Sequence, residues 1–307
     1  MDLTTRLGSL TLRNPLMSAS GTFGHGMEMR HFVPPGRLGA WVSKTVTPRP
    51  RHGNPAPRIQ ETEAGFLNSI GLENKGVGSY ASEVVPTLHG LDTVIITNIG
   101  GERPEAFAEA AAELDRHEEI DAFEVNLSCP NVDGGKLPFS TDPPVAEAII
   151  RGVREVTRKP ILAKLSPNVT RIGEMAVAVE AGGADGITAV NTLLGLAVDW
   201  RTGRPALNTG PGGYSGISIK PVALRCAWEC ARAVSIPVVG CGGVARAEDV
   251  LEYLAVGCRA VQVGTASFSD PGLLGRLPEE VAACLTGAGF EQLEDVVGIM
   301  GRAPALS

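Results

Sequence analysis

The chain of 307 residues is 43% hydrophobic and 20% charged, a composition typical of a globular protein. Its formal net charge is −7, so it lacks the basic surface that nucleic-acid-binding proteins need. No apolar run approaches the roughly 20 residues of a membrane span, and no basic stretch followed by an apolar one opens the chain. We therefore expect no nucleic-acid partner, no membrane attachment and no signal peptide, and we expect a cytoplasmic location.

The six cysteines form no CxxC pair, so we expect reduced thiols and not a disulfide framework. Cys226 and Cys230 lie four residues apart on a predicted helix, a spacing that could hold a metal ion. No histidine or second cysteine pair accompanies them, and free cysteine is among the most buried residue types. Core packing is therefore the preferred interpretation, and we expect no metal.

Short apolar, β-branched runs recur along the whole chain, and most are separated by segments of helical character. Runs of this kind are typical of strands that are buried on both faces of a parallel sheet. Proline near several helix starts and glycine near several ends mark the intervening helices. The expected strands are 15–20, 40–46, 93–99, 122–128, 161–166, 186–192, 237–243 and 260–266. The clearest helices are 104–117, 143–157, 171–183, 220–234 and 246–257.

Eight strand units in alternation with helices predict an α/β protein, a (β/α)8 TIM barrel that forms a single domain over residues 1–307. A doubly wound sheet is the alternative, but the GxGxxG fingerprint is absent after the first strand, and the glycine-rich stretch 240–243 opens the seventh unit instead. The intervals 47–75 and 195–219 are too long to be simple connections. We expect both to be active-site lids or binding loops.

The active site of such a barrel lies where the strands end, so the residues at the predicted ends indicate its chemistry. No Asp or Glu and none of the five histidines falls at these ends, which argues against a carboxylate-held metal and against a glycosidase pair. The residues present are lysines, amides, hydroxyls, glycines and one thiol. They are Ser20, Gly21, Lys44, Thr45, Asn98, Asn126, Ser128, Cys129, Asn131, Lys164, Asn191, Thr192, Gly242, Gly243, Gly264 and Thr265.

This set suits a flat, anionic ligand, because amides both donate and accept hydrogen bonds and lysines supply positive charge. Lys44 and Lys164 each interrupt an apolar run, and a lysine in a buried strand needs a partner. A solvated surface charge is the alternative for each. The glycines after the last two strands predict a phosphate cradle, with plain tight turns as the alternative. Cys129 is either a buried structural thiol or a reactive group.

These residues fall in stretches that resemble the class 1B dihydroorotate dehydrogenases, catalytic subunit, over essentially the full length of the chain. The match spreads over six or more barrel units. The matching stretches are SKTVTPRPRHGNPAPRI (43–59), NSIGLEN (68–74), NLSCPN (126–131), AKLSPNV (163–169), AVNTLLG (189–195), SG (215–216), KPVALR (220–225), GCGGV (240–244) and VQVGTA (261–266).

The chain departs from the family pattern in two places. Residues 212–221 read GGYSGISIKP, where the family more often has Leu before the Ser-Gly pair and Pro-Ala after it. This difference leaves Ser215 and Gly216 in place, so it puts the packing of the loop in question more than cofactor binding. The C-terminal stretch 287–303 matches only loosely.

The resemblance implies a (β/α)8 barrel that binds FMN at its strand ends and oxidises (S)-dihydroorotate to orotate in pyrimidine (UMP) biosynthesis. A proton would leave C5 for a base, which the resemblance identifies as Cys129, and a hydride would leave C6 for flavin N5. The implied substrate contacts are Lys44, Asn68, Ile70, Gly71, Leu72, Asn126, Asn131, Asn191 and Thr192. The implied FMN contacts are Ser20, Gly21, Lys44, Thr45, Asn98, Asn126, Lys164, Val190, Gly216, Gly242, Gly243, Gly264 and Thr265, the last four around the phosphate.

Cys129 is chemically suited to act as the base. An ordinary thiol is about 3% ionised at pH 7, and nearby lysine charge raises that fraction. The residue lies at a predicted strand end where no other plausible base occurs, which favours a reactive thiol over a buried structural one. Lys164 would stabilise negative charge that develops at flavin N1 and O2. The following loop, 131–143, suits a lid that excludes water, with a plain surface loop as the alternative.

The electrons must then leave the flavin, and the chain has neither a cluster-binding cysteine spacing nor an obvious nicotinamide site. The resemblance implies a homodimer that joins a second subunit, which carries FAD and a [2Fe–2S] cluster, in a heterotetramer with NAD as the final acceptor. Three alternatives stay open: fumarate or another acceptor; pyrimidine-base reduction as in dihydropyrimidine dehydrogenases, whose ferredoxin-like cysteine runs are missing here; and a flavin-free barrel that binds a phosphorylated ligand.

Overall fold

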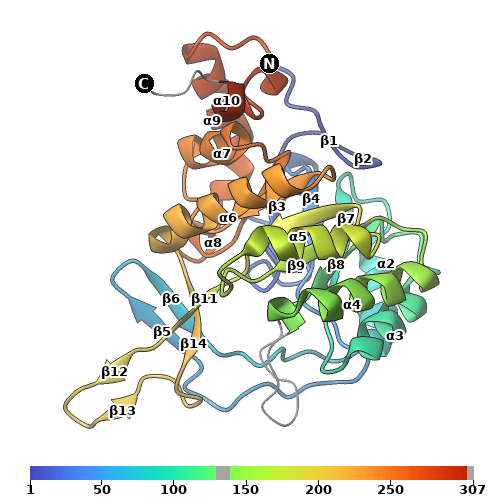
Figure 1. Ribbon diagram of the computed structural model, residues 1–307, viewed down its shortest axis with the longest axis vertical. Helices are drawn as coiled ribbons and strands as arrows, with labels where there is room; N and C mark the ends of the chain where they lie inside the picture. The colour runs from blue at the N-terminus through green and yellow to red at the C-terminus, as the bar shows by residue number, and fades with distance from the viewer. Residues whose placement is uncertain (129–138, 303–307) are drawn as a thin grey trace.

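Eight parallel strands close into a barrel at the centre of the molecule (Figure 1). The computed structural model describes residues 1–128 and 139–302. The order around the barrel is β10-β15-β16-β3-β4-β7-β8-β9, so the predicted (β/α)8 barrel is confirmed and a doubly wound sheet is excluded. The strands are β3 Leu16–Ser18, β4 Ala40–Val42, β7 Val94–Ile99, β8 Ala122–Asn126, β9 Ile161–Leu165, β10 Gly186–Ala189, β15 Val238–Cys241 and β16 Ala260–Val263.

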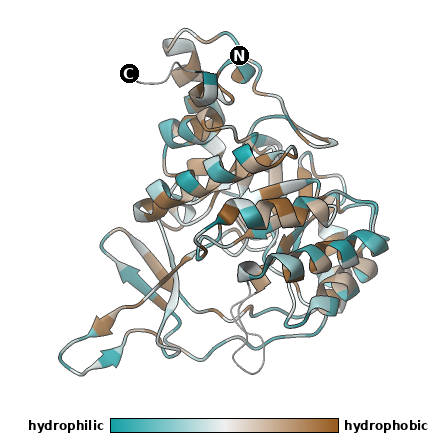
Figure 2. Cartoon of the chain, viewed as in Figure 1, coloured by the Kyte–Doolittle hydropathy of each residue, from teal (hydrophilic) through white to brown (hydrophobic). Residues whose placement is uncertain are grey.

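Helices surround the barrel. Each carries both hydrophobic and hydrophilic residues, as amphipathic helices do (Figure 2). Proline occupies the first turn of three predicted helices, where its missing N–H costs no hydrogen bond. The longer helices are α3 Pro104–Leu114, α4 Pro143–Val156, α5 Ile172–Ala181, α6 Lys220–Ala233, α7 Ala247–Ala255 and α9 Leu273–Gly287. The shorter ones are α1 Val77–Ser79, α2 Val85–Leu88, α8 Ala266–Ser269 and α10 Ile299–Arg302. All five helices that the sequence predicts are present within a few residues.

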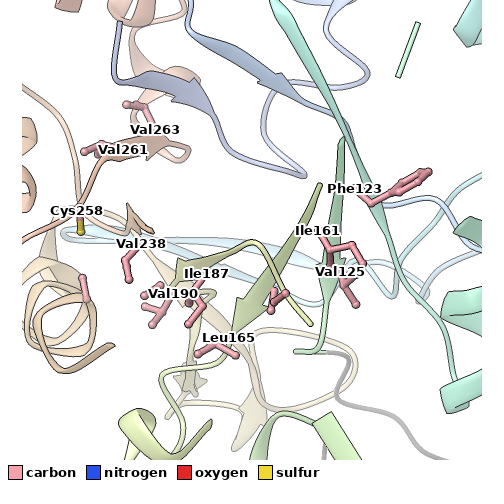
Figure 3. Close-up of a cluster of buried hydrophobic side chains, with 14 of the residues drawn as sticks. Phe123, Val125, Ile161, Leu165, Ile187, Val190, Val238, Cys258, Val261 and Val263 are labelled. Atoms are coloured by element: carbon pink, nitrogen blue, oxygen red, sulfur yellow. The ribbon is translucent and has the colours of Figure 1, made fainter. Parts of the chain in front are cut away.

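The barrel strands alternate between two environments because successive side chains point to opposite faces of a strand. Figure 3 shows one of the two sets, in which Phe123, Val125, Ile161 and Leu165 belong to the large hydrophobic core. That core also contains Cys226 and Cys230 of α6, so the prediction that these two cysteines pack in the core is confirmed. The intervening residues of β8 and β9 face the barrel axis.

A small hairpin lies at the N-terminal end of the barrel. Its strands are β1 Thr5–Leu7 and β2 Leu10–Leu12. Leu7 and Leu12 are buried in a second apolar cluster with Met17, Ile96 and Leu162, from the inner surface of the barrel. Because apolar side chains fill this end, the polar interior of the barrel is confined to the end where the strands finish.

The two long intervals form structure that the sequence did not predict. Together with the two residues before the second interval, they supply an antiparallel sheet of order β11-β14-β6-β5, with strands β11 Leu193–Gly195, β14 Gly212–Ser215, β6 Gly65–Asn68 and β5 Ile59–Thr62. A two-stranded hairpin, β12 Val198–Asp199 and β13 Arg204–Pro205, projects beyond it (Figure 1). The description of these intervals as loops was therefore wrong in part. Their pattern is weak because these strands are short and glycine-rich and pair with residues far away along the chain.

The packing of the outer core makes a quantitative prediction for Phe123, which is fully buried in β8. Replacing it with alanine should lower the free energy of unfolding by about 3–5 kcal/mol, because both transfer energy and packing are lost. Val177→Ala is the matched control, because that side chain on α5 is 49% exposed and should change stability by less than about 0.5 kcal/mol. Urea unfolding followed by circular dichroism measures both. Equal effects would contradict the core assignment.

Candidate active site at the C-terminal ends of the barrel strands

The structure brings most of the predicted site residues to one end of the barrel. Asn98, Asn126 and Lys164 stand at or near the ends of the neighbouring strands β7, β8 and β9, and Lys44 follows β4. Register pairs Asn126 with Lys164 and Lys164 with Thr188 of β10. Because all of these strands are parallel, their ends meet at the same mouth of the barrel.

Beneath this mouth lies a buried carboxylate that the reading of strand ends missed. Glu124 of β8 is fully buried and accepts hydrogen bonds from Asn98 Nδ2 at 2.6 Å, Thr188 Oγ1 at 2.8 Å and Gln262 Nε2 at 2.5 Å. Its Oε1 also lies 3.5 Å from Lys164 Nζ. The sequence prediction considered only the strand ends, where no Asp or Glu occurs, and so it did not identify Glu124, which lies inside β8. Glu124 precedes Asn126 by two residues, and side chains two apart on a strand share a face.

Lys164 is the cation of this network and is 3% exposed. Its Nζ donates to Gln262 Oε1 at 3.0 Å and Ser20 Oγ at 3.4 Å, besides facing Glu124. Burial alone would lower the pKa of Lys164, but the Glu124 carboxylate outweighs that effect and holds the pKa above its usual value. The expectation that a lysine inside this strand needs a partner is confirmed.

A second layer of amides lies above this network. Asn191 Nδ2 donates to Asn126 Oδ1 at 3.2 Å, and Asn126 Nδ2 lies 3.4 Å from Thr45 Oγ1. The Thr192 N–H is bound by Asn191 Oδ1 at 2.8 Å. Val190, just before, is buried and donates its N–H to Cys241 O at 2.9 Å. Amides from β8 and the end of β10 thus meet side by side, with donor and acceptor atoms on both.

The segment 70–72 binds its own long interval through its carbonyl groups and leaves its N–H groups without acceptors among the described residues. The carbonyls of Ile70, Gly71 and Leu72 accept from Asn54 N, Arg51 Nε and Asn74 Nδ2 respectively. None of the three N–H groups donates to another residue of the described chain. Gly71 and Leu72 have φ of 76° and 54°, and successive N–H groups in such a backbone form anion-binding concavities.

Asn68, at the end of β6, lies beside this segment in the sequence and donates through Nδ2 to Gly213 O at 3.3 Å. The antiparallel sheet therefore links the two long intervals at the substrate side of the predicted site. Cys129 and Asn131, the other two predicted contacts of this side, lie outside the described residues.

The glycine turns after β15 and β16 also present free donors. The N–H groups of Gly242, Gly243, Gly264 and Thr265 bind no acceptor within the ranges that the structure describes. Strands β15 and β16 are neighbours and parallel, so these four groups come from adjacent strand ends. Thr265 Oγ1 is 2.9 Å from Ser215 Oγ, which brings the next residue, Gly216, to the same region.

Open space remains beside the first strand end. A Cβ on Gly21 would meet no atom of the described residues within 4 Å, and Gly21 follows Ser20, whose hydroxyl reaches Lys164. Asn98 Oδ1 is buried and has no hydrogen-bond partner among the residues that the structure describes. Among the described residues no group of three or more His, Cys, Asp or Glu side chains could hold a metal ion, and no helix is long and apolar enough to cross a membrane.

Comparison with known proteins agrees with this geometry. The family model described as dihydroorotate dehydrogenase matches residues 2–285. The chain belongs to the dihydroorotate dehydrogenase family. The match includes all eight barrel strands and every residue of the site described above.

Curated members of the dihydroorotate dehydrogenase family resemble the chain over nearly its whole length. Proteins named dihydroorotate dehydrogenase B (NAD(+)), catalytic subunit, are 46% identical in Trichlorobacter lovleyi, 45% in Geobacter sulfurreducens and 43% in Bacillus pumilus. The alignments cover 97%, 97% and 99% of this chain and 98% of each relative. The sequence motifs resembled class 1B catalytic subunits, and the relatives carry the name of that class.

The donor set of this family member fits FMN. A flavin mononucleotide needs N–H donors around its phosphate, and the turns after β15 and β16 offer four unused ones. Its ring system needs amide partners and a cation, and Asn98 Oδ1 is an orphaned buried acceptor one strand away from the Glu124–Lys164 pair. The donors, the acceptor and the cation that FMN needs are therefore present at the ends of the barrel strands.

Proposed function

We propose that the chain is the catalytic subunit of an NAD-linked dihydroorotate dehydrogenase, which oxidises (S)-dihydroorotate to orotate in pyrimidine biosynthesis. The observation that carries this proposal is the mouth of the barrel, where two layers of amides and a buried Lys164 lie among unused N–H donors. The family and the names of the relatives supply the reaction class.

We assign the cofactor contacts from the positions of the unused groups. The N–H groups of Gly242, Gly243, Gly264 and Thr265 would hold the FMN phosphate, with Gly216 beside them. Around the ring system we place Ser20, Gly21, Lys44, Thr45, Asn98, Asn126, Lys164 and Val190. When bound, FMN would accept the hydride from C6 of dihydroorotate.

Other residues of this chain would bind and orient the substrate. The free N–H groups of residues 70–72 suit the substrate carboxylate, because a concavity of backbone donors favours an anion. The amides of Asn126 and Asn191 can bind the alternating N–H and C=O groups of a pyrimidine ring. Asn68, Lys44 and Thr192 would complete this set together with Asn131. Cys129 would take the C5 proton as the thiolate.

We propose that the electrons leave through a partner. The relatives are named catalytic subunits and NAD enzymes, which supports a second subunit with FAD and a [2Fe–2S] cluster and an assembly built on a homodimer of this chain, a heterotetramer. We also propose a cytoplasmic location, because all five cysteines of the described chain are free thiols, as in reducing compartments.

The half-reaction can be tested on the purified chain alone. We expect a yellow protein that releases FMN on denaturation and whose flavin absorbance bleaches when dihydroorotate is added without oxygen. Fumarate should not restore the colour, whereas NAD should do so only after the partner subunit is added. A colourless protein would favour a flavin-free barrel, and reoxidation by fumarate would favour the soluble acceptor.

The phosphate assignment makes its own prediction at Gly243. Its φ is +72°, and a Cβ there would lie 2.6 Å from Lys220 Cβ, so an alanine must shift the turn. We expect Gly243→Ala to weaken FMN binding by about tenfold or more, equivalent to about 1.4 kcal/mol. Gly289→Ala is the control, because Gly289 has φ +82° and no neighbour within 4 Å, so backbone strain alone is tested there. Fluorescence titration of the two apoproteins with FMN measures the difference, and equal affinities would exclude this turn from the phosphate site.

A further inference from the structure

The four partners of the Glu124 carboxylate define its charge. Asn98 Nδ2 and Lys164 Nζ face Oε1, and Thr188 Oγ1 and Gln262 Nε2 bind Oε2. The amide nitrogens of Asn98 and Gln262 and the ammonium of Lys164 can only donate hydrogen bonds. Each oxygen of the carboxylate therefore faces at least one donor. A protonated acid would place its own O–H against one of these donors. Three of the four partners can only donate and the Thr188 hydroxyl can donate as well, so this set of contacts favours the ionised form of Glu124.

The partners of Lys164 require the charged form as well. Its Nζ faces Gln262 Oε1, Ser20 Oγ and Glu124 Oε1, which can all accept. Gln262 has one possible orientation, because its amide nitrogen binds Glu124 and its oxygen binds Lys164. This bridging amide holds the two charges in a fixed arrangement.

Glu124 and Lys164 are so deeply buried that each one needs the other to balance its charge. Glu124 is 0% exposed and Lys164 is 3% exposed. Removing either partner of such a pair leaves a buried charge without compensation, and a buried lysine then loses its proton more readily. The mouth of the barrel lies above Lys164, so its ammonium is the charge of the pair nearer to a bound ring system.

We propose that Glu124 is a positioning residue, which acts through Lys164 by keeping its ammonium charged and fixed so that it compensates the negative charge that FMN gains on reduction. This inference rests on the proposed function. Two electrons and one proton convert the bound flavin to its reduced anion, and the Lys164 proton stays where it is throughout. Without Glu124, the lysine would be neutral beside the oxidised flavin and would take up a second proton when the flavin is reduced.

Among the described residues, the titratable groups that face Lys164 are Glu124 of β8 and Cys241 of β15. Strands β7, β10 and β16 present the neutral side chains of Asn98, Thr188 and Gln262 to the Glu124–Lys164 pair. Burial raises the pKa of the Cys241 thiol, which keeps it uncharged at neutral pH. Glu124 is therefore the negative charge that faces Lys164 in this part of the chain.

The test is the pH dependence of the flavin reduction potential, measured on the holoenzyme by dithionite titration with a reference dye. In wild type we expect one proton for two electrons between pH 7.5 and 9.5, about 30 mV per pH unit. In Glu124→Gln we expect a second proton, an additional tenfold change in the reduction equilibrium per pH unit and thus about 60 mV per pH unit. Equal slopes in the two proteins would overturn the inference.

Two further variants separate charge from structure. Glu124→Asp keeps the charge and should restore the wild-type slope. Asp185→Asn removes a carboxylate at the opposite mouth of the barrel, where Asp185 binds Arg154 Nη1 at 3.0 Å and Ile161 N at 2.8 Å. Asp185→Asn should leave the pH slope of the reduction potential unchanged. A steeper slope in this control would mean that the effect of Glu124→Gln comes from general disruption of the barrel.

The outcomes also separate this inference from the proposed function. Dithionite reduction requires no dihydroorotate, so equal slopes in a protein that dihydroorotate bleaches would overturn this inference alone. A colourless protein would overturn both. If the Glu124→Gln protein cannot be produced, the pH slope of the wild-type reduction potential tests the inference. A slope of two protons for two electrons in wild type would overturn it, because Lys164 would then be neutral beside the oxidised flavin.

Discussion

Replacing Cys129 with serine is expected to slow the reduction of the flavin by dihydroorotate by about 100-fold or more. A serine hydroxyl ionises far less readily than a thiol, whose ordinary pKa is about 8.5, so the variant lacks a competent acceptor for the C5 proton. Anaerobic stopped-flow spectroscopy of the flavin absorbance measures the rate constant directly. FMN content should stay at the wild-type level, because the proposed role of Cys129 is on the substrate side.

Cys284→Ser is the matched control for this change. Cys284 is a free thiol of α9 with intermediate exposure, and it is not one of the proposed site residues. Its substitution should leave the rate constant unchanged. The pH profile gives a second criterion, because a thiolate base requires the wild-type rate to rise with pH until the thiol is ionised in the complex. A flat profile between pH 6 and 10, or a rapid Cys129→Ser enzyme, would contradict the assignment.

Replacing Lys164 with methionine is expected to destabilise the protein by about 3–5 kcal/mol, because it leaves Glu124 as a buried charge without its cation. Flavin should be lost or held weakly as well. Lys164 has a raised pKa in the folded protein, so its stabilising effect is complete below its ordinary pKa of 10.5 and disappears as the pH rises through the higher folded value. Urea unfolding at pH 7 therefore measures the full effect.

A double variant distinguishes loss of the pair from loss of packing. Lys164→Met combined with Glu124→Gln removes both charges, and we expect it to recover a measurable part of the stability that Lys164→Met loses. Lys75→Met is the control, because Lys75 pairs with Glu83 at the surface and solvent screens that pair. If the Lys164 and Lys75 variants lose the same stability, the buried pair does not contribute as proposed.

The strands, the helices and most of the site could be predicted from local sequence patterns. Apolar runs such as 161–166 predict strands because every side chain in them is buried, and a polar residue inside such a run stands out. Lys164 and Asn98 were found in this way, and parallel strands necessarily end at the same mouth of the barrel. The sequence by itself therefore determined the architecture and the position of the site.

Only the tertiary structure decided which side chains complete the site. Glu124 interrupts the apolar run 122–128 as Lys164 interrupts its own run, but the rule that places chemistry at strand ends passes over it. Its partners Thr188 and Gln262 are 64 and 138 residues away, so sequence spacing does not relate them to it. Likewise, β6 and β14 pair only when residues about 145 apart meet, as Asn68 and Gly213 do. Sequence periodicity indicates the burial of one segment at a time. Which buried polar groups face one another depends on the closure of the barrel, and in this protein that closure places Glu124 beside Lys164.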